Sequence, residues 1–160
     1  MLIKRVNKVT IRKLITALIL FSFIIIGCID ALLHNQVTYS SIMGMDISRV
    51  YFYTFFLLII GCWLLYNKFL TGIGFITLAT FSSYFPEYLS LHNYFASIVI
   101  YIGLLVDIII RRKVLWLIPF IVLGLLQGIA FQNFNFINYI VGSMELVSLL
   151  IGSIFIVKNI

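Results

Sequence analysis

The side chains best suited to chemistry are two histidines and three carboxylates: Asp30, His34, Glu87, His92 and Glu145. Carboxylates and imidazoles can hold a metal ion or act as a general base, so Glu87, His92 and Glu145 are candidate catalytic residues. His34, His92 and Glu87 are the candidate metal ligands. The chain has only two histidines and no H-x-x-x-H or H-E-x-x-H pair, so a metal site would need carboxylates in place of a third histidine.

The composition indicates the class of protein in which these residues lie. Of the 160 residues, 63% are hydrophobic and 10% are charged, whereas soluble domains average about 25% charged residues. The apolar residues form long blocks, which is typical of an integral membrane protein. The basic residues flank these blocks, as orientation signals do, so the net charge of +6 does not indicate nucleic-acid binding.

Six apolar runs predict an all-α, six-helix bundle that forms a single transmembrane domain over residues 1–160. Each run is close to the length of about 17–25 residues that a membrane-spanning helix needs. The expected spans are 14–33, 50–66, 69–85, 92–110, 114–131 and 138–157.

The basic residues predict the orientation of the bundle. With the N-terminus inside, all of the 11 Lys and Arg residues except Arg49 fall on the inner side. The positive-inside rule therefore predicts a multi-pass protein of a prokaryotic cytoplasmic membrane with both termini cytoplasmic. Membrane lipids are the expected partners, together with a membrane protein or a second copy of the chain. We predict no cofactor.

The polar residues gather toward the expected outer face. Helical spacing places Asp30 and His34 on one face of the first span, and it places Thr80 and Glu87 on one face of the third. Glu145 lies about 10 Å below the outer end of the last span, at 1.5 Å per residue. The sequence thus predicts an outward-facing polar pocket. Its expected ligand-binding residues are Asp30, His34, Thr80, Tyr84, Glu87, His92 and Glu145.

Two further features concern the interior of the membrane. A carboxylate such as Glu145 costs about 2.5–3.5 kcal/mol on insertion scales, so it is expected to be paired, protonated or functional. Gly124 and Gly128 form a small-xxx-small pair that is expected to serve packing.

Several short motifs resemble a known family. Ser40-Ser41-Ile42-Met43-Gly44 lies in the first outer loop, Phe85-Pro86-Glu87 precedes a helix that opens on His92, and Gly142-Ser143-Met144-Glu145 lies in the last helix. This order resembles the bacterial and archaeal six-helix family known as domain of unknown function 998, and more distantly the DRAM and Frag/Sfk membrane families. The resemblance implies the six-helix fold and leaves the activity open. It singles out Ser41, Gly44, Pro86, Glu87, His92 and Glu145.

Three functions remain open from the sequence. The first is a non-enzymatic bundle that binds a lipid or amphiphile, or that acts as an accessory or structural membrane subunit. The second is a membrane-embedded hydrolase with a metal or carboxylate–histidine site on the outer side. The third is a small proton-coupled transporter that uses Glu145, Gln127 and Asp107.

Overall fold

The computed structural model describes residues 7–36, 45–81, 92, 99–133 and 139–160, and the regular secondary structure of these residues is all helical. The predicted all-α fold class is therefore confirmed. The helices are α1 (Lys8–His34), α3 (Ile47–Tyr66), α4 (Thr71–Thr80), α6 (Ile100–Ile110), η3 (Val114–Trp116), α7 (Leu117–Asn133) and α8 (Tyr139–Asn159).

Each predicted span overlaps one of these α-helices, but their ends differ. α1 begins at Lys8 because the Asn7 side chain accepts a hydrogen bond from the Val9 N–H and caps the helix. Three helical segments are long and apolar enough to cross a membrane: Lys8–His34, Ile47–Tyr66 and Gly142–Asn159. Shorter apolar helices cover Thr71–Thr80, Ile100–Ile110 and Val114–Ile129.

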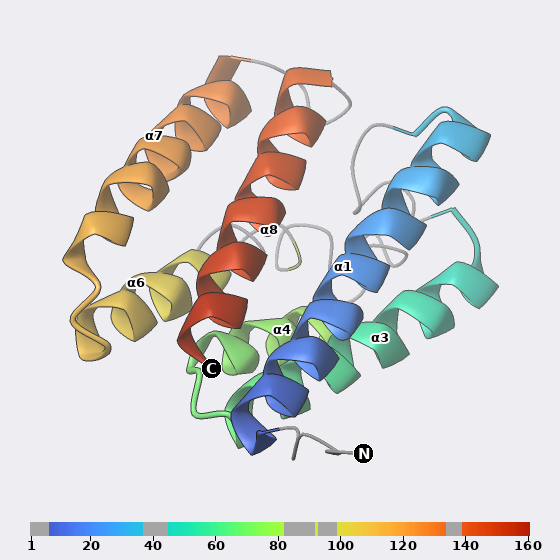
Figure 1. Ribbon diagram of the computed structural model, residues 1–160. Coiled ribbons are helices and arrows are strands. Elements are labelled where there is room, and N and C mark those ends of the chain that lie inside the picture. The colour runs from blue at the N-terminus through green and yellow to red at the C-terminus, as the bar shows by residue number, and fades with distance from the viewer. Residues whose placement is uncertain (1–6, 37–44, 82–91, 93–98, 134–138) are drawn as a thin grey trace, which may run out of the picture.

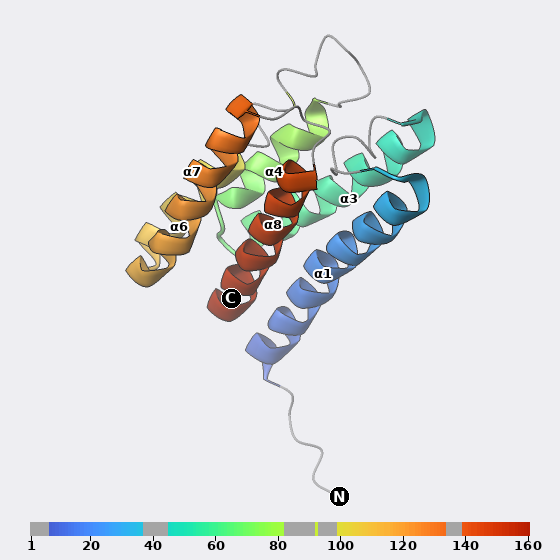
Figure 2. The ribbon, with the colours of Figure 1, turned by 90° about the horizontal axis from the view of Figure 1, so that it is seen from above.

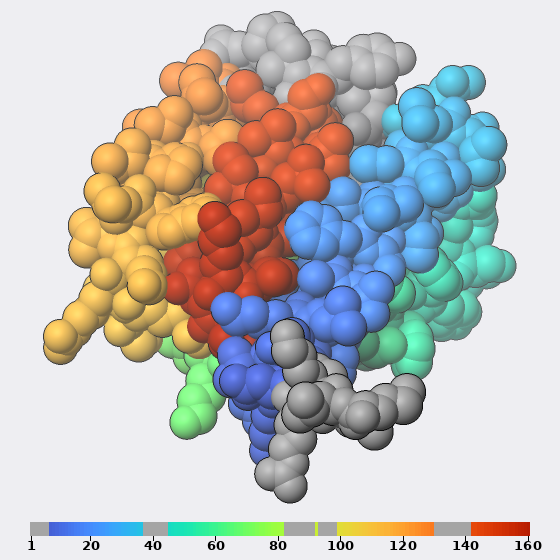
Figure 3. All heavy atoms as spheres, viewed as in Figure 1, coloured from blue at the N-terminus to red at the C-terminus, as the bar shows by residue number. Residues whose placement is uncertain are grey.

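The helices form a closed ring. Each α-helix named above packs against the next one along the chain, and α8 packs back against α1 (Figure 1). Viewed from above, α3 and α4 lie on the other side of the ring from α1 and α8 (Figure 2). The surfaces of α1 and α8 meet along the face seen in Figure 3. The ring encloses a core of aliphatic and aromatic side chains that includes Leu57, Ile60, Leu64, Phe69, Ile108, Phe120 and Phe155.

Glycines bring α4 close to its two neighbours. A Cβ atom on Gly61 would lie 2.8 Å from the Gly72 carbonyl oxygen, so α3 and α4 touch through their backbones. On the other side of α4, a Cβ on Gly103 of α6 would lie 2.9 Å from Thr71 Cα. Close helix–helix approach of this kind is typical of membrane bundles, where small residues let backbones come together.

One end of the ring carries almost all of the described positive charge. Here α1 begins, α3 and α6 end, and α8 ends, so the N- and C-terminal helices share this end (Figure 1). Arg111 ties the helix ends together by donating to the Asn159 carbonyl at 2.8 Å and to the Lys68 carbonyl at 3.2 Å. We call this the basic end, and its residues are Lys8, Arg12, Lys13, Lys68, Arg111, Arg112, Lys113 and Lys158.

Candidate functional site

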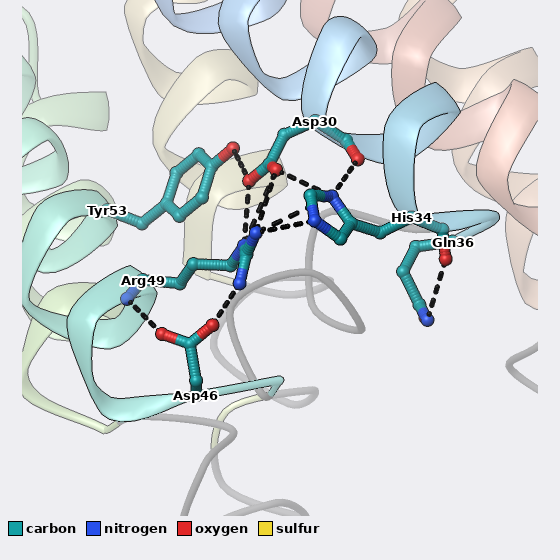
Figure 4. Close-up of polar contacts among 6 residues, drawn as sticks. All are labelled: Asp30, His34, Gln36, Asp46, Arg49 and Tyr53. Carbon is teal, nitrogen blue, oxygen red and sulfur yellow. Dashed lines mark hydrogen bonds and ion pairs between the residues drawn. The ribbon is translucent and has the colours of Figure 1, made fainter.

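A cluster of charged and polar side chains lies at the opposite end of the ring, about 33 Å along α1 from Arg12 to His34 at 1.5 Å per residue. Its members come from the last turns of α1 and the first turns of α3, which pack against each other. We call it the Arg49 cluster, and Figure 4 shows its members pointing toward one another: Asp30, His34, Asp46, Arg49 and Tyr53.

Arg49 is the centre of the cluster. Its Nε donates to Asp30 Oδ2 at 3.2 Å, and its Nη1 donates to the Asp46 carboxylate. Its Nη2 lies 2.8 Å from His34 Nε2. The guanidinium therefore connects the two helices and lies between two carboxylates. Arginine can do this because its planar guanidinium presents several N–H donors in a fixed geometry, whereas the ammonium group of lysine does not.

His34 contacts Asp30 through Nδ1 and faces Arg49 with Nε2. Its Nδ1 lies 2.9 Å from the Asp30 carbonyl oxygen and 3.0 Å from Asp30 Oδ1, and both of these are acceptors. Nδ1 must therefore carry the proton. Nε2 is then the acceptor that faces the Arg49 N–H groups. This is the neutral imidazole, and a second proton on Nε2 would point at the guanidinium.

One side of the Arg49 cluster is buried and the other is exposed. We call the exposed side, which Asp46 forms, the rim. Tyr53 is buried, and its hydroxyl donates to Asp30 Oδ2 at 3.0 Å. The Asp46 side chain is 41% exposed, whereas that of Asp30 is 19% exposed. Asp46 also caps α3, because it accepts the Arg49 backbone N–H at 2.9 Å, and this hydrogen bond lowers the pKa of its carboxyl.

The net charge of the Arg49 cluster follows from these assignments. Two ionised carboxylates face one guanidinium, and the imidazole is neutral, so the cluster carries one surplus negative charge. The more exposed carboxylate is Asp46, so the surplus lies at the rim. A partner that complements this site would bring a positively charged group.

A second polar group joins α6, α7 and α8 in the interior. The Tyr101 hydroxyl donates to Gln127 Oε1 at 2.8 Å and is also hydrogen-bonded to Ser148. Glu145 lies one turn from Ser148 on α8, close enough to Tyr101 to interact electrostatically. Gly124 leaves room for the Tyr101 ring, which would lie 3.8 Å from a Cβ at that position. Tyr101 is thus hydrogen-bonded to Gln127 and lies near Glu145, two residues that the sequence placed in separate helices.

Asp107 belongs to neither group. It is buried on α6, where its two oxygens accept the backbone N–H groups of Leu70 and Thr71 at 2.8 and 2.9 Å. These N–H groups belong to the first turn of α4, which has no side-chain cap of its own. Asp107 therefore caps a neighbouring helix.

The structure brings some of the predicted site residues together and separates others. Asp30 and His34 meet in the Arg49 cluster. Thr80 bonds to the Ile76 carbonyl of its own helix at 3.0 Å. His92 is buried, with Nδ1 2.7 Å from the Phe81 carbonyl oxygen. A Cβ at Gly128 would have no atom within 4 Å. The predicted positions that lie outside the described residues are Ser41, Gly44, Tyr84, Pro86 and Glu87.

The described residues contain no group of three His, Cys, Asp or Glu side chains that could hold a metal ion. Within the Arg49 cluster, the Arg49 guanidinium lies between the carboxylates and the imidazole. A metal site that includes Glu87 stays a prediction, because that residue is not among those described.

The sequence interpretation missed Asp46, Arg49 and Tyr53 as members of the site. Arg49 carried a signal, because it is the one basic residue at the expected outer face and it follows Asp46 by three positions. An acidic cap and a basic residue at this spacing lie on the same side of the first helical turn. Tyr53 carried no such signal, since tyrosines occur throughout the apolar runs.

Comparison with known proteins found no matching family model, no matching curated protein and no matching solved structure. The resemblance to the six-helix family of unknown function therefore stays a prediction.

Proposed function

We propose that this is a multi-pass protein of a prokaryotic cytoplasmic membrane, with both termini inside, that binds an ammonium-bearing amphiphile at the outer face. The orientation is supported by the basic end, which gathers eight described Lys and Arg residues at the end shared by the first and last helices. Arg49 is the one described basic residue away from this end.

The observation that carries the binding proposal is the surplus carboxylate of the Arg49 cluster. Asp46 is the most exposed charged group of the cluster and shares a single guanidinium with Asp30. An ammonium headgroup would supply the missing positive charge and would donate to the free lone pairs of these carboxylates.

Apolar side chains surround this rim and favour an amphiphile over a small soluble cation. Leu32 and Leu33 precede His34 and are 80% and 73% exposed, and Ile47 follows Asp46 and is also exposed. An alkyl chain could lie along these side chains while its headgroup reaches the carboxylates. The proposed ligand therefore combines a cationic head with an apolar tail.

The test uses a photoactivatable alkylamine and the uncharged alkanol of the same length, each added to the protein in nanodiscs. We expect the amine to label peptides that contain residues 29–53 more strongly than the alkanol does. Asp46→Asn should abolish this preference. Asparagine is as good a helix cap as aspartate, so the variant removes the charge and keeps α3 intact. Equal labelling by both probes, or a preference that survives Asp46→Asn, would refute the proposal.

A second candidate is a structural or accessory membrane subunit. It is favoured by one observation: within the Arg49 cluster, Arg49 already makes contacts with Asp30, Asp46 and His34. In that case the cluster holds α1 and α3 together and binds nothing. The alkylamine would then label no better than the alkanol, while Arg49→Met would lower the thermal stability.

A further inference from the structure

We propose that the basic end holds a second site, independent of the Arg49 cluster, which binds the phosphate group of an anionic phospholipid between α1 and α8. The site consists of Arg12 and Lys13 on α1 and Lys158 on α8, and its occupant comes from the surrounding bilayer. We call these three residues the phosphate site.

The first argument is the uncompensated charge of the basic end. It contains eight Lys and Arg residues, and the only side-chain carboxylate that the structure describes near them is Asp107. This carboxylate is 2% exposed and already accepts hydrogen bonds from the N–H groups at the start of α4. No described ion pair involves a cation of the basic end. Phosphate groups are the anions that a membrane surface supplies.

The second argument is that Lys13 on α1 reaches the backbone of Lys158 on the adjacent helix α8. Lys13 Nζ reaches across from α1 and donates to the Lys158 carbonyl oxygen at 3.4 Å. The fold therefore places Lys13 beside another lysine. Like charges on neighbouring helices repel each other, and an anion bound to both removes that repulsion.

The third argument is the aromatic setting of these cations. Lys158 Nζ lies 5.7 Å from the centre of the Trp116 ring, and the Arg12 guanidinium lies 5.4 Å from the centre of the Tyr66 ring. Tryptophan and tyrosine concentrate at the level of lipid headgroups. The three cations are therefore placed at the depth at which a headgroup phosphate would lie.

The apolar surface beside the site selects a phospholipid as the occupant. Leu14 and Leu18 follow Lys13 on α1 and are 60% and 59% exposed, and Ile154 lies one turn before Lys158 and is exposed on α8. Acyl chains can cover these side chains while the phosphate is bound by the lysines. A free phosphate ion would leave them uncovered.

The experiment measures the thermal stability of purified protein in a neutral detergent after addition of phosphatidylglycerol, phosphatidylcholine or inorganic phosphate. We expect phosphatidylglycerol to raise the Tm more than phosphatidylcholine, and inorganic phosphate to have little effect. The double variant Lys13→Gln/Lys158→Gln should lose the preference for phosphatidylglycerol. The matched control, Arg112→Gln/Lys113→Gln, removes the same charge from the same end and should keep the preference.

Three results would overturn the proposal. Equal stabilisation by both lipids would mean that phosphate charge is not recognised. Equal loss in both double variants would mean that the basic end attracts anions diffusely and has no site between α1 and α8. Stabilisation by inorganic phosphate as large as that by phosphatidylglycerol would identify a free anion as the ligand and exclude the lipid. Circular dichroism of each variant establishes that it is folded.

Discussion

Gly72 on α4 lies so close to Gly61 on α3 that a Cβ atom at Gly72 would lie 2.5 Å from the Gly61 carbonyl oxygen. Real Cβ atoms do not approach a backbone oxygen so closely, and a backbone atom cannot move aside as the end of a side chain can. The α3–α4 contact therefore depends on the absence of side chains at both positions.

Gly72→Ala should consequently destabilise the bundle. Overpacking a well-packed contact costs about 1–3 kcal/mol, and the added methyl group would force α3 and α4 apart. The measurement is the free energy of unfolding in a mixed detergent titrated with sodium dodecyl sulfate. Gly128→Ala is the control, because a Cβ there meets nothing within 4 Å and should leave stability unreduced. Equal effects of the two substitutions would contradict the described α3–α4 contact.

Asp107→Ala should also destabilise the fold, because it leaves the Leu70 and Thr71 N–H groups without their acceptor. A buried donor without a partner costs about 1–3 kcal/mol. Ile109→Ala is the control on the same helix, since Ile109 is exposed. The same unfolding titration compares the two variants. A loss no larger than that of Ile109→Ala would show that Asp107 does not cap α4.

Tyr101→Phe should weaken the packing of α6 against α7 and α8, because the hydroxyl links Gln127 and Ser148. Hydrogen bonds between membrane helices contribute about 0.6 kcal/mol on average and at most about 1.7 kcal/mol, so the loss should be small but measurable. Tyr51→Phe, at an exposed tyrosine on α3, should change nothing. A comparison of Tm values in one detergent is sufficient, and identical values for the two variants would argue against the network.

The lowered pKa of Asp46 predicts a dependence of stability on pH. A carboxyl whose pKa is lower in the folded state stabilises that state when it is ionised, and this contribution is lost as the pH falls below the ordinary value of 3.8 and through the folded value. The Tm advantage of the wild type over Asp46→Asn should therefore be present at neutral pH and disappear in acid. An advantage that is independent of pH would mean that the ionised carboxylate does not stabilise α3.

The sequence predicted the helices better than it predicted their contacts. The apolar runs located the helices because each run of helix length indicates a helix by itself. Helical spacing correctly placed Asp30 and His34 on one face, because they are four residues apart. Arg49 could be matched to Asp30 only after α1 and α3 were packed together, since the two residues lie 19 positions apart.

Asp107 and His92 also make contacts that could not be predicted from the sequence. Gly103 lets α6 approach the first turn of α4, which Asp107 on the same helix caps. Nothing in the sequence identifies α4 as the helix that needs a cap. His92 was expected to bind a ligand in an outward-facing pocket, and it is buried against the Phe81 carbonyl oxygen, which lies 11 positions earlier in the chain.

The contact between α1 and α8 closes the ring, so chain order does not decide which helices are neighbours. The start of α1 and the end of α8 lie at the same end, where Lys13 reaches the Lys158 carbonyl. A circularly permuted protein, in which a short linker joins α8 to α1 and the chain starts at α7 and stops at α6, would therefore keep all of the contacts between neighbouring helices.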